Sequence, residues 1–150
     1  MKSFQYPLAR LKQIRDVEMQ AGVSAVHALQ QAIDGVDQRI NEKIQETRTV
    51  WQTLQDTERK QGRLQLEMRQ LSGLYVHGLH AAQLQLEKRR EGLEQERAVA
   101  HEALLQKRQS VRMLERHEQR LSDDFHTARE KTVQRRDDDA WLARLPTGRH

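Results

Sequence analysis

The sequence predicts an all-α fold, a long antiparallel two-helix coiled coil, and three observations predict it. Only 36% of the 150 residues are hydrophobic and 32% are charged, which is too little apolar material for a globular core but enough for a narrow helical stripe. The only prolines are Pro7 and Pro146, so the interval between them lacks the strongest helix breaker. Apolar residues also recur at the alternating three- and four-residue spacing of a coiled-coil seam.

The first helix is expected over residues 5–71, with Pro7 in its first turn. Steps of three and four residues from Ile33 follow a seam that polar residues interrupt. The stripe is weaker upstream, where small residues would allow a close helix approach. The apolar members, in chain order, are Leu11, Ile14, Ala21, Ala25, Leu29, Ile33, Val36, Ile40, Val50, Leu54, Leu64, Met68, Leu71 and Tyr75.

The second helix is expected over residues 83–144, followed by a short C-terminal tail. Here the repeat is stricter, and a repeat of seven implies a left-handed supercoil. One row runs through Leu79, Leu86, Leu93, Ala100, Leu114, Leu121 and Ala128, and its partner row includes Leu104, Val111 and Phe125. The first helix is the expected partner of this stripe.

The turn between the helices is expected at residues 72–82. Gly73 and Gly78 lie there in the most apolar and least charged segment of the chain. The chain then forms a single coiled-coil domain over residues 1–150, as a monomeric hairpin. The structural alternative is one continuous helix that dimerises, since a glycine inside a helix costs only about 1 kcal/mol.

No catalytic residue, cofactor site or metal site is expected, and the chain is not expected to be an enzyme. The absence of cysteine excludes thiolate catalysis and cysteine-based zinc sites. Gly73 and Gly78 have the spacing of a phosphate-binding loop, but the lysine and hydroxyl residue that should follow are missing. His77 and His80 have no carboxylate or thiol nearby in sequence. The consecutive acids Asp137–Asp139 would point in different directions on a helix, which does not suit a cation.

The charge balance predicts a helix surface that is stabilised by ion pairs, without nucleic-acid binding. The 26 basic residues exceed the 22 acidic ones by only four, and clusters such as Lys88–Arg90 are interleaved with acids. Trp141 lies in a charged terminal segment and is a candidate anchor for another protein. Trp51 either flanks the seam or is a second anchor. No apolar run suits a signal peptide or a membrane span, so a cytoplasmic location is expected.

The N-terminal motif resembles the start of the flagellar export protein FliJ family, which is related to the YscO family. The motif reads Phe4-x-Tyr6-Pro7-Leu8-x-x-Leu11-x-x-Ile14-Arg15-x-x-Glu18-x-x-Ala21. The charged closing segment is also similar to that of the family, with Leu114-Glu115-Arg116, Arg129-Glu130, Gln134-Arg135 and Asp138-Asp139. Trp141 departs from the family pattern, because an alanine would be expected after the acidic pair.

The resemblance implies a cytoplasmic stalk component of a type III protein export apparatus, peripheral at the inner membrane. Such a protein is expected to insert its helical ends into a hexameric export ATPase, and to contact the export gate protein and export chaperones. The residues implied at the ATPase-binding tip are Leu8, Leu11, Arg15, Glu18, Arg135, Arg136, Asp138 and Asp139. The residues assigned to the gate or to another partner are Trp51, Tyr75, Leu79 and Ala82.

Two other functions fit the same sequence. A homodimeric coiled-coil scaffold would pair through residues 79–132 and would be unrelated to secretion. A helical nucleic-acid-binding protein would show affinity that falls steeply with salt. The resemblance leaves open whether the export system is a flagellum or an injectisome.

Overall fold

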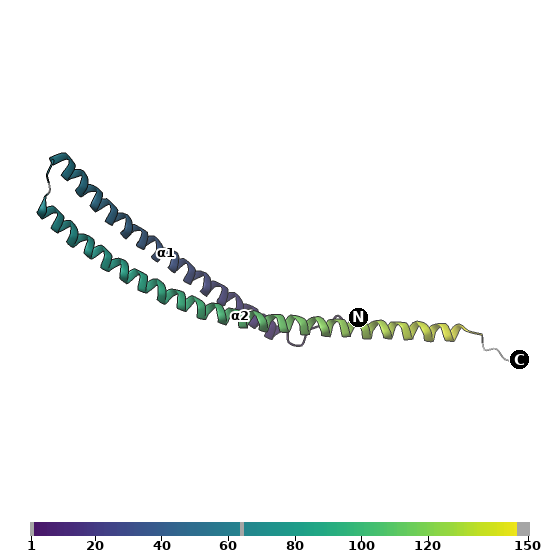
Figure 1. Ribbon diagram of the computed structural model, residues 1–150. Coiled ribbons are helices and arrows are strands. Elements are labelled where there is room, and N and C mark those ends of the chain that lie inside the picture. Colours follow the sequence, from purple (N-terminus) through teal and green to yellow (C-terminus); the bar gives the residue numbers. More distant parts are fainter. Residues whose placement is uncertain (1, 64, 147–150) are drawn as a thin grey trace. The chain divides into compact units, whose positions relative to one another are not determined.

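The computed structural model describes residues 2–63 and 65–146, and this part of the chain forms two α-helices and no strand. Helix α1 is Ala9–Gln61 and helix α2 is Leu66–Arg144. The two helices run in opposite directions and pack against each other as a hairpin (Figure 1). The predicted fold class is therefore confirmed. Residues 147–150, which belong to the expected C-terminal tail, lie outside the described residues.

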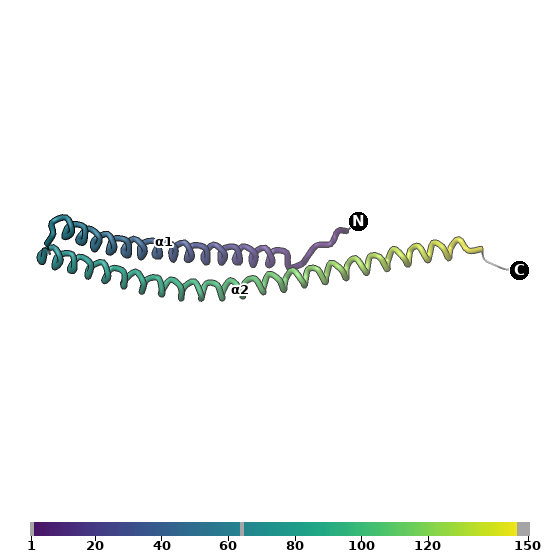
Figure 2. The backbone as a smooth tube through the Cα atoms, turned by 45° about the horizontal axis from the view of Figure 1, so that its top comes forward, coloured from purple at the N-terminus to yellow at the C-terminus, as the bar shows by residue number. Residues whose placement is uncertain are grey.

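The chain divides into two compact units. Residues Ala21–Leu104 form one unit, and Met1–Gln20 together with Leu105–His150 form the other. In the first unit, Ile33 is only 2% exposed and forms a core cluster with Val36 and Leu93. Figure 2 shows the two helices side by side. Burying each such side chain contributes about 1.5–3 kcal/mol, so a row of them offsets the entropy of ordering the helices.

Polar pairs fix one register between the helices of this unit. Arg90 donates from Nε to Asp37 Oδ1 at 2.5 Å, and Arg97 donates to Gln30. Arg69 binds Glu58 with two hydrogen bonds, of 2.6 Å and 2.8 Å. The residue numbers of each pair add up to the same total, so the helices do not slip relative to each other along this unit. Apolar stripes alone would permit such a slip, because they repeat every heptad.

Helix α1 ends before residue 62 and α2 begins at Leu66, so the prediction of a turn at 72–82 is wrong. Helix α1 ends at Gln61 and is followed by Gly62, whose φ of 66° lies in the left-handed region, the usual way for a glycine to end a helix. Gly73 and Gly78 lie inside α2, which begins at Leu66 and not near residue 83. They are tolerated there because each glycine costs only about 1 kcal/mol in a helix. The predicted end of the second helix, residue 144, is confirmed.

The second unit joins the N-terminal segment and the start of α1 to the later part of α2. Tyr6 precedes the helix, and yet it is only 8% exposed. The rings of Phe4 and Phe125 lie 5.7 Å apart. Within the described residues, every position of α2 from Glu130 onwards is exposed. This last part of α2 therefore has no partner helix within the described chain.

Substitution of the glycines by alanine tests the position of the turn. Gly62→Ala should lower the free energy of unfolding by about 1 kcal/mol, because an alanine is strained at positive φ. Gly73→Ala and Gly78→Ala should each raise it by about 0.5–1 kcal/mol, since nothing lies within 4 Å of the added Cβ. Urea unfolding followed by circular dichroism measures the three values. A reversed pattern of signs would return the turn to residues 72–82.

The ion pair that closes the hairpin should make stability depend on acid pH. The hydrogen bonds from Arg69, and then its charge, lower the pKa of Glu58 below 4.5. Because the fold favours the ionised carboxylate, this stabilisation is present above pH 4.5 and is lost as the pH falls through the lowered pKa. The difference in melting temperature between the wild type and Glu58→Gln should therefore shrink below pH 4.5. Glu42→Gln is the matched control, because Glu42 makes no ion pair with a described residue. A difference that stays constant with pH would contradict this account.

Candidate functional site

The candidate sites are surfaces and not a buried centre. No three His, Cys, Asp or Glu side chains come together as a possible metal site in the described residues. Neither described helix has an apolar stretch long enough to cross a membrane. The question is therefore which exposed side chains each unit gathers on one surface.

The N-terminal part of the expected tip lies at the start of α1. Leu8 and Leu11 are both exposed, and Arg15 forms an ion pair with Glu18 at 3.1 Å. In this i, i+3 pair the two side chains bind each other on the helix surface. Such a pair stabilises a helix by only a few tenths of a kcal/mol. The four residues present two apolar and two mutually paired charged side chains to solvent.

A network of aromatic and charged groups anchors this region to α2. The Tyr6 hydroxyl lies 2.7 Å from His117 Nδ1, and the two rings are 5.5 Å apart. Lys12 donates from Nζ to Glu118 at 2.5 Å, and this hydrogen bond raises the pKa of Lys12. Tyr6 was part of the sequence motif, but its role as an anchor was not predicted. The only feature of the sequence that could have indicated this role is an aromatic residue directly before Pro7.

The C-terminal part of the expected tip is not in contact with the N-terminal part. Arg135, Arg136, Asp138 and Asp139 are all exposed on α2. Glu118, which faces Lys12, comes 17 residues before Arg135 along α2, a distance of roughly 25 Å at 1.5 Å per residue. The unit therefore presents two separate surfaces where the resemblance implied one tip.

The residues expected to face the gate differ in accessibility. Leu79 is 7% exposed, so its side chain belongs to the interface between α1 and α2 and is not available to a partner. Ala82 is half-buried, whereas Trp51 and Tyr75 are exposed. Leu71 and Leu74, which the sequence analysis did not assign to a partner, are among the most exposed large apolar side chains of the chain.

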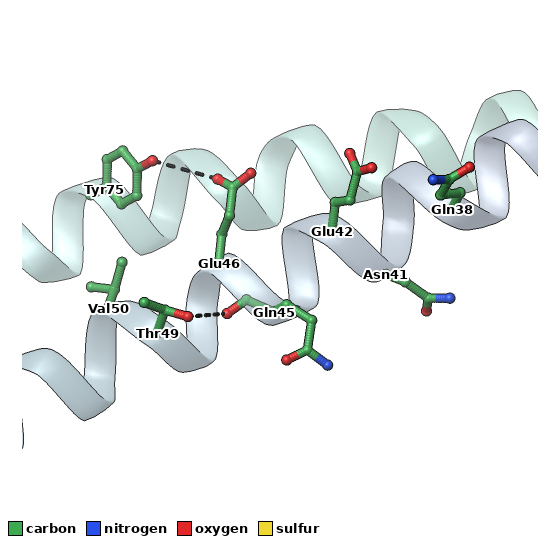
Figure 3. Close-up of a pocket in the computed structure, with 8 residues that line it drawn as sticks. All are labelled: Gln38, Asn41, Glu42, Gln45, Glu46, Thr49, Val50 and Tyr75. Atoms are coloured by element: carbon green, nitrogen blue, oxygen red, sulfur yellow. Dashed lines mark hydrogen bonds between the residues drawn. The ribbon is translucent and has the colours of Figure 1, made fainter.

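Tyr75 closes one side of a surface hollow of about 600 Å³. Its hydroxyl lies 3.5 Å from Glu46, and Val50 adds the second apolar group (Figure 3). The other lining side chains come from α1 and are polar: Gln38, Asn41, Glu42, Gln45, Glu46 and Thr49. Most of them are exposed, so the hollow is shallow and suits a protein side chain better than an enclosed small ligand.

The chain has no match among protein-family models, curated proteins or solved structures. The class that the fold itself defines is an all-helical protein with two long helices packed against each other. Its function has to be argued from the surfaces described above.

The anchoring of Tyr6 can be measured directly. Tyr6→Phe should lower the free energy of unfolding by about 0.5–1.5 kcal/mol, because it removes a hydrogen bond. Tyr6→Ala should cost more, about 2–4 kcal/mol, because it also removes a buried ring. Tyr75→Phe is the control, since that ring is exposed and its hydroxyl interaction is long. Equal effects of the two phenylalanine variants in urea unfolding would show that Tyr6 is not an anchor.

Proposed function

We propose that the chain is a non-enzymatic stalk component of the flagellar type III protein export apparatus. In this role it inserts into the hexameric export ATPase, regulates it, and links it to the export gate protein and export chaperones. It acts in the cytoplasm, peripherally at the inner membrane. The resemblance of the N-terminal motif from Phe4 to Ala21 carries the proposal.

The hairpin supports this proposal because a stiff pair of helices suits a stalk. Residues Met1–Gln20 and the end of α2 belong to the same compact unit, so the start of α1 and the end of α2 are parts of one structural element. The exposed helix from Glu130 to Arg144 carries basic and acidic side chains that could contact the charged lining of a ring. A differential interaction of about 1–3 kcal/mol is enough to couple two sites.

The homodimeric scaffold is less well supported by the structure. Its seam would use residues 79–132, but Leu79, Leu93, Leu104 and Val111 are already buried within the chain. A second copy would have to displace α1 to reach them. In an intact hairpin, α2 is not paired with α1 from about Phe125 onwards. Only the last few residues of the predicted 79–132 seam would therefore remain available to a second copy.

The stalk proposal predicts an effect on the cognate ATPase. Addition of the chain should tighten hexamer formation by about 5- to 150-fold, the range of typical coupling energies, and should raise turnover. Replacing Arg135, Arg136, Asp138 and Asp139 by alanine should remove most of this effect. Light scattering and phosphate release measure the two quantities.

The matched control replaces Glu87, Lys88, Arg89 and Glu91 by alanine, since these four exposed residues of α2 carry the same number of each charge. This variant should activate the ATPase as the wild type does. An ATPase whose assembly and turnover are unchanged by the wild-type chain would refute the stalk proposal.

A further inference from the structure

An exposed apolar face runs along α2 close to the start of the helix. Leu71 and Leu74 are 67% and 71% exposed, whereas Val76 and Leu79 are buried. Residues 70–86 contain no Asp, Glu, Lys or Arg, although 32% of the chain is charged. A surface helix normally carries charged side chains on the face that it turns to solvent. This stretch is therefore apolar on the face that the hairpin leaves uncovered as well as on the face that it buries.

The exposed face has the spacing of a second coiled-coil seam. Leu71 and Gly78 are seven residues apart, as are Leu74 and Ala81, and alternate steps of three and four residues connect all four. All four are exposed. The positions that flank a seam commonly carry charges that select the partner. Here the flanking positions are uncharged: Gln70, Tyr75, His77, Ala82 and Leu84. A partner helix is therefore selected by the sizes of the seam residues and not by charge.

The seam residues are large at one end and small at the other. Leu71 and Leu74 come first, and Gly78 and Ala81 follow. Among the described residues, nothing lies within 4 Å of a Cβ added to Gly78, so the packing of the hairpin itself does not require a glycine there. A glycine inside a helix costs about 1 kcal/mol, but it allows another chain to approach the backbone closely. The small end of the seam therefore fits a helix that carries large side chains.

A second copy of the same face meets this requirement. Two copies can lie antiparallel about a two-fold axis that passes midway between Leu74 and Gly78. Leu74 of one copy then lies opposite Gly78 of the other, and Leu71 lies opposite Ala81. The two-fold axis repeats both pairs, so each of the four leucines meets a small residue. The seam is therefore complementary to itself in the antiparallel direction.

We propose that two copies of the chain pair antiparallel through this face of α2. At each end of the seam Glu67 of one copy lies opposite Gln85 of the other, so a carboxylate meets an amide donor and like charges are not opposed. The face from Glu67 to Gln85 is roughly 27 Å long and about 10 Å wide, the width of a helix. This is well below the roughly 800 Å² that each partner buries in a standard stable interface. The dimer is therefore weak and reversible, and it leaves the buried contacts between α1 and α2 in place.

Substitution of the two helical glycines tests the pairing. Sedimentation equilibrium of the full chain, from about 1 µM to about 1 mM, should show a monomer that becomes a dimer. Gly78→Leu should weaken the dimer at least about tenfold, because the new side chain overfills the space opposite Leu74 of the second copy. The matched control is Gly73→Leu, which makes the same change at a glycine of α2 that lies off the seam and also has nothing within 4 Å of its added Cβ. The control should dimerise like the wild type, and circular dichroism should show unchanged helix content in both variants.

An exchange of the two sizes tests the antiparallel direction. Leu74→Gly combined with Gly78→Leu again sets a large residue opposite a small one, so it should restore the dimer to within about threefold of the wild type. Parallel copies would oppose each position to itself and would gain nothing from the exchange. A face that associates only because it is apolar would instead bind more tightly in Gly78→Leu alone, since that variant adds apolar surface.

Disulfide cross-linking measures the same direction independently, because the chain has no cysteine of its own. Oxidation of an equimolar mixture of Leu71→Cys and Ala81→Cys chains should give a cross-linked dimer. Leu71→Cys alone should give little, since its two copies lie roughly 15 Å apart along the paired helices. The Cα atoms of a disulfide are no more than about 7 Å apart.

Several results would overturn the proposal. These are a chain that stays monomeric over the whole concentration range, equal effects of the two glycine variants, or efficient cross-linking of Leu71→Cys alone. A monomer that sediments with neutral phosphatidylcholine vesicles, and loses this binding in Leu71→Gln, would assign the face to a lipid surface. The stalk proposal is tested separately, because residues 67–85 lie in the unit Ala21–Leu104 and the residues varied for the ATPase lie in the other unit.

Discussion

The whole structure depends on burying one narrow apolar stripe between two helices whose other faces are charged. Ile33, Val36 and Leu93 form its centre, and few other side chains of the described chain are buried. Because the net stability of a protein is a small difference between large terms, such a thin core leaves little margin. The polar pairs across the helices then matter mainly for choosing the register and less for the stability they add.

The sequence was sufficient to predict the helical hairpin, because its composition and its heptad spacing can both be read from neighbouring residues without knowledge of long-range contacts. It was not sufficient to locate the turn. Moving the turn from the predicted residues 72–82 to the connection between Gln61 and Leu66 slides α2 along α1 by roughly four heptads, which again places apolar rows opposite each other. Periodicity cannot distinguish two such registers. The left-handed Gly62 and the pairs Asp37–Arg90 and Glu58–Arg69 distinguish them. The two pairs join residues that are 53 and 11 positions apart in the sequence.

The same limitation explains which site residues could be anticipated. Exposure of Trp51 and Arg135 follows from their position relative to the heptad stripe, and the structure agrees. Leu79 lies on the stripe itself, so its burial followed from the heptad rows and should have excluded it as a contact residue. The Tyr6 anchor could not be inferred, because its partner His117 is 111 positions away in the sequence. The separation of the two parts of the expected tip likewise follows from the register.

The unequal lengths of the helices, 53 and 79 residues, determine where a partner can act. The helix continues beyond Glu130 because the unfavourable first turn is already formed in the paired part of α2. Each further residue then adds a backbone hydrogen bond. The sequence of this segment does not stabilise the helix, since Asp137, Asp138 and Asp139 lie near a helix C-terminus, where the helix dipole disfavours negative charge. A segment that is exposed, apolar at Val133 and Trp141, and unfavourably charged for a helix end is stabilised by a surface that covers its apolar side chains and offers cations to its aspartates.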